Sequence, residues 1–133
     1  MTPPAAAPAA AGLFEIGQIC VNIKDVDRAV AFYRDSLGIP FLFQAPPGLA
    51  FFQCGAVRIM LSLPETPEYD HPSSVLYFNV RDIAGIHQTL VKRGVRFEGE
   101  PHIVHRGPGF ELWMGFFKDT EGNTLALMEQ KAG

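Results

Sequence analysis

One stretch of this sequence occurs twice, and the repeat constrains the fold more than any other feature. Residues 21–41 (VNIKDVDRAVAFYRDSLGIPF) recur as residues 78–97 (FNVRDIAGIHQTLVKRGVRF), with Asp25 matched by Asp82. Both copies lead into a strand-like segment that begins with two phenylalanines. A repeated unit too small to bury its own apolar face packs against its copy, so we expect two halves that enclose one site.

Length and composition indicate a single ordinary globular domain. The chain has 133 residues, of which 47% are hydrophobic and 19% charged, and a chain of this size buries about two-thirds of its unfolded surface. The net charge is −3, and no run of Lys or Arg could follow a phosphate backbone, so we expect no nucleic-acid partner. No apolar stretch approaches the roughly 20 residues that span a bilayer, so we expect no membrane association.

The N-terminal segment and the cysteines bear on the compartment. Residues 1–12 (MTPPAAAPAAAG) carry no positive charge, and prolines interrupt the alanines, which favours a flexible tail over a secretory signal. Cys20 and Cys54 are the only two cysteines, too few for a disulfide framework. The sequence therefore predicts a reduced, cytoplasmic protein.

The remainder reads as one domain over residues 13–130, made of two modules with the same order of elements. In each module a strand is followed by a helix that begins after an aspartate cap (Asp25, Asp82) and ends at a glycine. A proline-rich linker joins the modules. Module one covers residues 13–63, with strands at 13–23, 39–43, 49–53 and 57–63; the linker covers 64–72; module two covers 73–130, with strands at 75–80, 95–97, 103–105, 111–117 and 123–129.

The repeated strand–helix–strand–strand–strand unit, the segment KDVDRAVAFYRDSLG and the ending FFKDTEGNTLALME together resemble the vicinal oxygen chelate superfamily. This group includes glyoxalase I, fosfomycin and bleomycin resistance proteins and extradiol dioxygenases. The resemblance covers residues 14–130. It implies an α+β fold in which two tandem βαβββ modules form a cupped, barrel-like mixed sheet with the helices outside. It also implies a homodimer, with the modules paired either within one chain or across two.

The resemblance further implies four inward positions that hold a divalent metal in the metal-dependent members. In this chain they fall on Gln18, Met60, Val75 and Ala126. An amide oxygen is an acceptable ligand, but the other three side chains offer no oxygen or nitrogen donor. No neighbouring residue supplies a carboxylate or imidazole if the register shifts by one. We therefore predict no metal and no other cofactor.

Alternation along the strands divides their residues between a cavity lining and a core. If Gln18 faces inward, the lining is mixed in character and the opposite set is wholly apolar. The predicted lining is Gln18, Cys20, Asn22, Arg58, Met60, Ser62, Val75, Tyr77, Asn79, Thr124, Ala126 and Met128. The predicted core is Ile19, Val21, Ile23, Ile59, Leu61, Leu63, Leu76, Phe78, Val80, Leu125 and Leu127.

Arg58 is the sharpest candidate in the lining. Inside a cavity its guanidinium, which keeps its charge and needs acceptors, would bind an anionic or carbonyl-bearing ligand. Alternatively it lies near the strand start and reaches solvent or a glutamate. Gln18 is predicted to act as a hydrogen-bonding amide and Tyr77 to line the pocket, although a tyrosine satisfied by a neighbour fits equally. No base lies beside Cys20 in the sequence, so it is expected to be a small inward hydrophobe.

A second candidate group lies around the turn at residues 106–109. In a tight hairpin His102 lies opposite Trp113, which places both on one face with Glu111. That face is either a ligand-contacting patch with a His–Glu pair or a polar pair at a sheet edge. His105 lies three residues after His102, so the two imidazoles are expected on opposite faces unless a bulge intervenes.

These observations favour a metal-independent protein that binds a small organic molecule between its modules, similar to the bleomycin-resistance type. A lyase, isomerase or dioxygenase with an unusual metal set such as Gln18, His102 and Glu111 is the alternative. A structural or regulatory dimer with a vestigial cavity is another. The predicted ligand-binding residues are Gln18, Cys20, Asn22, Arg58, Met60, Tyr77, His102, Glu111, Trp113 and Ala126.

Overall fold

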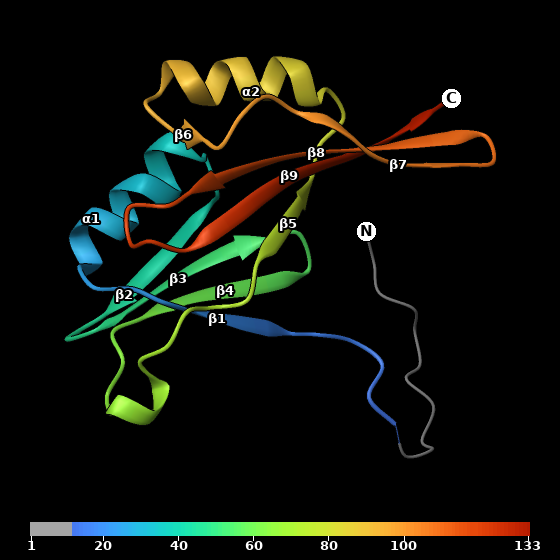
Figure 1. The fold of residues 1–133 in the computed structure, drawn as a ribbon. Helices are drawn as coiled ribbons and strands as arrows, with labels where there is room; N and C mark the ends of the chain where they lie inside the picture. Colours follow the sequence, from blue (N-terminus) through green and yellow to red (C-terminus); the bar gives the residue numbers. More distant parts are fainter. Residues whose placement is uncertain (1–11) are drawn as a thin grey trace.

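Each repeat forms a mixed sheet with a helix on its outer side, as the computed structural model shows (Figure 1). The structure describes residues 12–133, so the predicted N-terminal tail lies outside the described residues except for its last residue. The first sheet has the order β1–β4–β3–β2, and the second has the order β5–β9–β8–β6 with β7 also paired to β8. β1 pairs with β4 and β5 with β9 in parallel, and the other pairings are antiparallel. The predicted α+β fold with two equivalent modules is confirmed.

The strands of the first sheet are β1 (Gln18–Asn22), β2 (Phe41–Ala45), β3 (Leu49–Cys54) and β4 (Val57–Ser62). Those of the second are β5 (Leu76–Asn79), β6 (Arg96–Phe97), β7 (His102–Gly107), β8 (Phe110–Lys118) and β9 (Thr124–Ala132). The prediction that the first strand starts at residue 13 was wrong. Gly17 contributes its carbonyl to the Arg58 amide at the start of β4, and β4 does not extend further to pair with the residues before Gly17.

The first helix begins at the predicted aspartate cap. Asp25 Oδ1 accepts a hydrogen bond from the Arg28 amide (3.0 Å), which satisfies one of the free N–H groups at the start of α1 (Val26–Ala31). The helix continues as a π-helical segment, η1 (Phe32–Ser36), which the sequence pattern did not predict. Gly38 follows with φ +73°, the left-handed conformation expected of a glycine after a helix.

The second helix repeats this arrangement. Asp82 Oδ1 accepts from the Gly85 amide (3.1 Å) at the start of α2 (Ile83–Lys92), and Gly94 ends the segment with φ +88°. Between the modules, the segment predicted to have no regular element contains a short 3-10 helix, η2 (Pro67–Tyr69). Within residues 12–133 no helix has both the length and the apolar character needed to cross a membrane.

The core lies between the helices and the outer faces of the two sheets. Tyr33 and Phe52 are fully buried there, and their rings lie 6.0 Å apart. All of the strand residues predicted for the core are buried in it or pack against it: Ile19, Val21, Ile23, Ile59, Leu61, Leu63, Leu76, Phe78, Val80, Leu125 and Leu127. The predicted assignment of these strand residues to the core is therefore confirmed.

The turn between β8 and β9 links the second module to the first helix. Glu121, whose side chain is fully buried, accepts from the Lys24 and Asp25 amides (2.7 and 2.9 Å) and forms an ion pair with Arg28 (2.8 Å). Asp119 accepts from the Tyr33 hydroxyl (2.7 Å). Glu121 of module two therefore satisfies backbone amides at the start of α1, and Asp119 binds the η1 segment that follows this helix.

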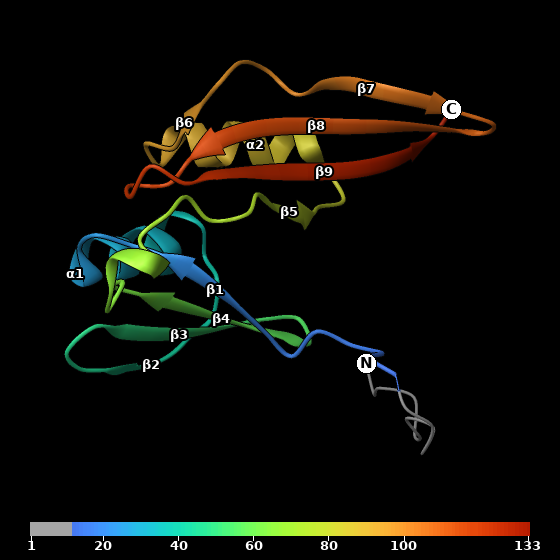
Figure 2. The same ribbon diagram turned by 60° about the horizontal axis from the view of Figure 1, so that its bottom comes forward.

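The two sheets lie side by side, with β5 next to β1, and together they form a curved surface (Figure 2). The Asn123 side chain donates to the Asn22 carbonyl (2.8 Å), which ties the start of β9 to the end of β1. The helices lie on the convex side (Figure 1). The opposite, concave face is thus left for the residues that the sequence assigned to a cavity.

Candidate functional site

The concave face of the first sheet holds a hydrogen-bonded group around Arg58. Gln18 and Arg58 are direct neighbours in the parallel pairing of β1 and β4. Arg58 Nε donates to Gln18 Oε1 (2.7 Å), and Gln18 Nε2 donates to Met60 Sδ (3.6 Å). All three residues were predicted to share this face, and the structure brings them into contact. The amide thus holds the guanidinium through one N–H group and leaves the terminal nitrogens open.

An aromatic floor supports the guanidinium. Arg58 lies over the ring of Phe51, with 5.1 Å from the guanidinium carbon to the ring centroid. Phe51 in turn stacks on Phe43, with centroids 4.6 Å apart. Phe51 is 8% exposed and Phe43 is 47% exposed, so the floor is buried under the arginine and open at its outer end. A cation held over an aromatic face is stabilised by the ring quadrupole.

Phe43 and Phe51 were not predicted from the sequence to lie in the site. The signal was present, because Phe51 pairs with Met60 across β3 and β4 and directly opposite residues share a face. Phe43 pairs with Phe51 across β2 and β3. Extending the alternation from β4 to its antiparallel neighbours would have found both rings.

The second sheet contributes a more apolar lining. Tyr77 meets Phe116 edge to face, with centroids 6.0 Å apart, and is itself 46% exposed. Ala126, the cross-strand neighbour of both residues, is fully buried. Met114 and Met128 pair with one another on the same face of β8 and β9. Aromatic rings and thioethers accommodate flat or irregular apolar groups.

Cys20 and Asn22 share β1 with Gln18 but have different surroundings. Burial raises the pKa of the Cys20 thiol, so it stays protonated at neutral pH and is a weak nucleophile. Asn22 uses its side-chain N–H groups on the linker, where it donates to the carbonyls of Tyr69 (2.7 Å) and His71 (2.8 Å). The structure therefore gives Asn22 a scaffold role in positioning the linker.

The prediction that His102, Glu111 and Trp113 share one face was wrong. In the structure His102 pairs with Met114, whereas Arg106 pairs with Glu111. A bulge in β7 between Ile103 and His105 inserts one extra residue, and the tight turn also shifts the register. His102 therefore lies on the concave face with Met114. Glu111 and Trp113 lie on the convex face.

The same bulge reverses the expectation for the two histidines of this strand. His105 pairs with Leu112, which shares a face with Met114, so His102 and His105 lie on one face rather than on opposite faces. On the convex face Glu111 forms an ion pair with Arg106 (2.5 Å) and accepts from Trp113 Nε1 (3.1 Å). The structure therefore keeps Glu111 and Trp113 together but separates them from His102.

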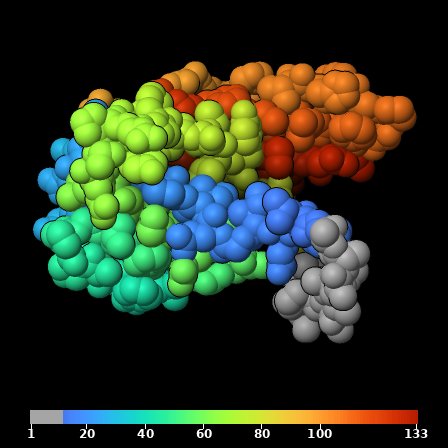
Figure 3. Space-filling model, turned by 90° about the horizontal axis from the view of Figure 1, so that it is seen from below, coloured from blue at the N-terminus to red at the C-terminus, as the bar shows by residue number. Residues whose placement is uncertain are grey.

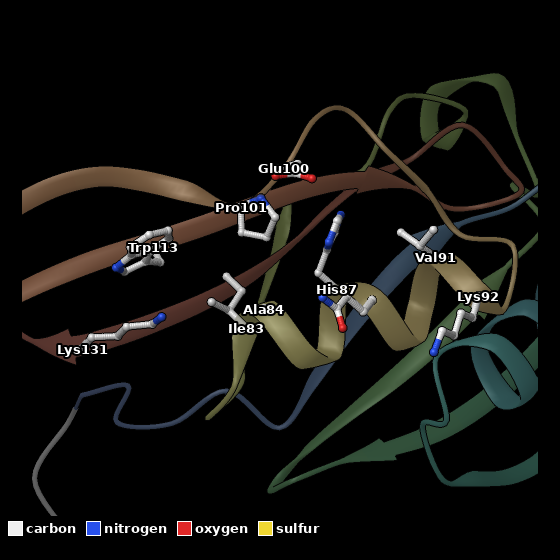
Figure 4. Close-up of a pocket in the computed structure, with 10 residues that line it drawn as sticks. Ile83, Ala84, His87, Val91, Lys92, Glu100, Pro101, Trp113 and Lys131 are labelled. Carbon is white, nitrogen blue, oxygen red and sulfur yellow. The ribbon is translucent and has the colours of Figure 1, made fainter.

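The surface is hollowed between the first strand, in blue, and the strands of module two, in orange and red (Figure 3). The concave face is an open cup rather than a closed chamber. Pockets elsewhere on the molecule include one beside Asn22 and the linker, and the one between α2 and β8 shown in Figure 4.

Comparison with known proteins gives the chain its family. The family model of the Glyoxalase/Bleomycin resistance protein/Dioxygenase superfamily matches residues 15–127. The chain belongs to this superfamily. The resemblance to this superfamily that the sequence motifs indicated is therefore confirmed, and the match spans both modules.

Individual members of the superfamily are similar over most of the chain. A glyoxylase-like domain-containing protein of Didymella fabae is 29% identical in an alignment 128 positions long that covers 85% of this chain and 91% of that protein. A superfamily member from Sphaerobacter thermophilus has a solved structure with a TM-score of 0.73 and 23% identity, covering 88% of this chain and 98% of that one. The solved lactoylglutathione lyase of Agrobacterium tumefaciens gives a TM-score of 0.67 at 23% identity, covering 96% of each chain. The structural likeness establishes the fold.

The residues at the superfamily's metal positions do not fit a divalent ion. Gln18 has its amide oxygen engaged by Arg58, and a guanidinium beside it repels a cation. Met60 offers only a thioether, and Val75 and Ala126 offer no lone pair. Among residues 12–133 no three His, Cys, Asp or Glu side chains are grouped as metal ligands. The alternative set of Gln18, His102 and Glu111 is not assembled, because the last two lie on opposite faces of the hairpin.

Proposed function

We propose that this protein binds a small organic anion on its concave face, with Arg58 as the anchor for a carboxylate or similar group. The observation that carries the proposal is the hydrogen bond from Arg58 Nε to Gln18 Oε1. It holds the guanidinium at Nε, and within the described residues the terminal nitrogens of Arg58 form no hydrogen bond or ion pair. A carboxylate meets such a pair of N–H groups in a two-point contact, and charge-assisted bonds of this kind are about twice as strong as neutral ones.

The partners of Arg58 support an anionic ligand over the alternative of an internal ion pair. Among the described residues no Asp or Glu lies within 4.0 Å of its nitrogens, since the ion pairs formed involve Arg28, Arg34, Arg106 and Lys118. The positive charge is therefore uncompensated on this face. A ligand that carries a negative charge would neutralise the Arg58 guanidinium.

The rest of the lining favours a ligand whose anionic group is attached to a flat, apolar ring system. Phe43, Phe51, Tyr77 and Phe116 supply aromatic rings, and Met60 contacts Gln18 and is the cross-strand partner of Phe51. Half-exposed rings gain burial when a ligand covers them, at about 25 cal/mol per Å² of apolar surface removed from water. We therefore propose an aromatic carboxylate or phosphonate as the ligand class.

The proposed activity is binding without chemistry, in the manner of the bleomycin-resistance type. No residue of the cup is placed as a nucleophile beside a base, and the raised pKa of the Cys20 thiol disfavours the most obvious candidate. The donor set at Gln18, Met60, Val75 and Ala126 offers no metal-assisted route. Sequestration of a ligand requires affinity alone.

We also propose that a second copy of the chain helps to close the cup. The hydrophobic side chains Leu42, Phe43 and Tyr77 are 43%, 47% and 46% exposed, and edge strand β2 has a free side. Exposed apolar groups beside an open sheet edge favour association. Analytical ultracentrifugation should then give the mass of a dimer at micromolar concentration. A monomer that still binds the ligand would contradict this part alone.

A thermal-shift screen of carboxylates, phosphonates and aromatic drugs tests the proposed function. A bound ligand at a hundred times its dissociation constant stabilises the fold by about 2.7 kcal/mol, which is readily measured. We expect hits among aromatic anions, and we expect the shift to be lost in Arg58→Ala. Arg96→Ala removes an exposed arginine from edge strand β6 of the other sheet and serves as the matched control. Hits that persist undiminished in Arg58→Ala would overturn the proposal, and a screen without hits would favour a vestigial cavity.

A further inference from the structure

A second cavity lies on the convex side of the molecule, outside the cup. It has a volume of about 500 Å³ and lies between helix α2 and strand β8, where the segment before β7 crosses over (Figure 4). This volume falls within the range of sites that hold small organic molecules. The cavity shares no residue with the cup, because Trp113, which lines it, points to the opposite face of β8 from Met114. A ligand in this cavity would therefore contact no residue of the cup.

The middle of this convex pocket is apolar and packs against β8. Ile83 is buried at its base, and Pro101 forms the wall next to β8. A Cβ on Gly115 would lie 3.2 Å from the Pro101 ring, so the proline is packed directly on the strand. His87 projects from α2 toward the same space (Figure 4) and rests edge-on against Phe97, with centroids 4.4 Å apart. A ring system placed here would contact apolar surface on three sides.

One end of the convex pocket carries an oriented positive charge. The Lys131 ammonium lies 4.4 Å from the centroid of the Trp113 ring, and its side chain points toward the start of α2 (Figure 4). No carboxylate in the described chain lies within 4.0 Å of this ammonium. The indole therefore orients the charge without neutralising it.

The acidic neighbours of Lys131 are engaged elsewhere. Glu111, its partner across β8 and β9, is bonded to Arg106 and to the indole N–H. Glu129 accepts from the Ile83 amide (2.9 Å) at the start of α2. Glu100 lies on the rim beside Pro101, on the other side of the pocket from Lys131 (Figure 4). The ammonium thus keeps donors for a ligand that enters from solvent.

We propose that this convex pocket is a second binding site, which takes a small aromatic monocarboxylate. The ring lies against Pro101 and Ile83 between His87 and the edge of Trp113, and the carboxylate accepts from the Lys131 ammonium. Glu100 on the far rim disfavours a second negative charge and gives the ligand one orientation. The single charge and the apolar body follow from the position of Lys131 beside the apolar floor, since Lys92, the other lysine that lines the pocket, lies at its opposite end (Figure 4).

Trp113 is the only tryptophan in the chain, so it reports on the convex pocket alone. Protein labelled with 5-fluorotryptophan will show one ¹⁹F resonance, and titration with 1-naphthoate should shift it along a saturable curve. Uncharged 1-naphthamide, which has the same rings, should bind at least about tenfold more weakly, as should 1-naphthoate to Lys131→Gln. Ala84→Phe on the exposed side of α2 should block the pocket. Arg58→Ala, in the cup, should leave the curve unchanged.

Several results would overturn the proposal. One is the absence of a saturable shift with 1-naphthoate in folded, labelled protein. Equal affinities for naphthoate and naphthamide, or an unchanged affinity in Lys131→Gln, would remove the charge recognition. Loss of the shift in Arg58→Ala would assign the ligand to the cup. A resonance that moves with protein concentration in the absence of naphthoate would show that the groove is an interface between copies. Lys92→Gln, at the other end of the pocket, is the matched control and should change the affinity by less than about twofold.

Discussion

Arg58 Nε donates to Gln18 Oε1 over 2.7 Å on the concave face of the first sheet. Gln18 occupies the position at which the superfamily's metal-dependent members carry a ligand, and its amide oxygen is here given to a guanidinium. The cup therefore keeps a positive charge at this position, carried by a side chain in place of an ion. In the proposed function, this charge is the group that an anionic ligand would meet.

Gln18→Leu should weaken ligand binding in the cup although the leucine itself contacts no anion. Without the amide oxygen, Arg58 loses the acceptor that holds it and must be ordered when the ligand binds. We expect the dissociation constant of a carboxylate found in the screen to rise several-fold, in line with a lost hydrogen bond to a charged group of about 1.5 kcal/mol or more. Calorimetric titration measures it. Met60→Leu removes only the weak sulfur contact, and an equal loss in that control would contradict the argument.

Glu121→Gln should destabilise the protein at neutral pH and flatten its acid dependence. Burial alone would raise the pKa of Glu121, but bonds from Arg28, Thr120 and the Lys24 and Asp25 amides outweigh it and lower the pKa from 4.5 to about 2. Because the folded-state pKa is depressed, the stabilisation is present above pH 4.5 and is lost as pH falls toward 2. The shift corresponds to roughly 3 kcal/mol.

Urea unfolding between pH 2 and pH 7 tests this prediction. The wild-type free energy of unfolding should fall steeply below pH 4.5, and the Glu121→Gln variant should start lower and change less. Glu68→Gln replaces an exposed carboxylate in η2 and is the matched control. Identical pH profiles for wild type and Glu121→Gln would contradict the account.

Tyr33→Phe should cost about 1–3 kcal/mol of stability, because it leaves a buried carboxylate with one hydrogen bond fewer. The Tyr33 hydroxyl donates to Asp119 Oδ2 (2.7 Å), and the pKa of this tyrosine is raised well above its ordinary value by burial and by Asp119. Thermal and urea unfolding measure the change. Tyr69→Phe, at an exposed ring, should have almost no effect, and a comparable loss in both variants would refute the role of the buried pair.

Metal-free protein prepared with a chelator should not recover a stoichiometric ion when titrated with Zn²⁺, Ni²⁺, Mn²⁺ or Fe²⁺. The reason is the donor set at the superfamily's metal positions, where Met60, Val75 and Ala126 supply no oxygen or nitrogen. Mass spectrometry of metals and calorimetry check it. One tightly bound ion per chain, lost in Gln18→Leu, would show that the cup recruits ligands from elsewhere in the chain.

The sequence predicted the scaffold well because local rules determine it. Asp25 and Asp82 cap helices as expected, since an aspartate before an apolar helical stretch satisfies free N–H groups wherever the helix later packs. The alternation of apolar and mixed residues, such as Ile59 and Met60, correctly assigned side chains to the core or to the cup. The reason is that successive side chains of a strand point to opposite faces of the sheet. These predictions required no knowledge of distant contacts.

The site was less predictable because it depends on register between strands. The bulge beside Val104 adds one residue to β7, and a single added residue moves every later side chain to the other face. The predicted grouping of His102 with Trp113 failed for that reason. Phe43 was missed because its place on the cup follows only from its pairing with Phe51. Bulges and cross-strand partners are properties of the assembled sheet.

The central claim is that Arg58 anchors an anion in the cup, and calorimetric titration of the tightest carboxylate from the screen tests it most directly. Wild type and Arg96→Ala should bind with the same dissociation constant, and Arg58→Ala should bind at least about tenfold more weakly, as expected for a lost charge-assisted contact. An Arg58→Ala variant that is folded and binds the carboxylate as tightly as wild type would contradict the claim.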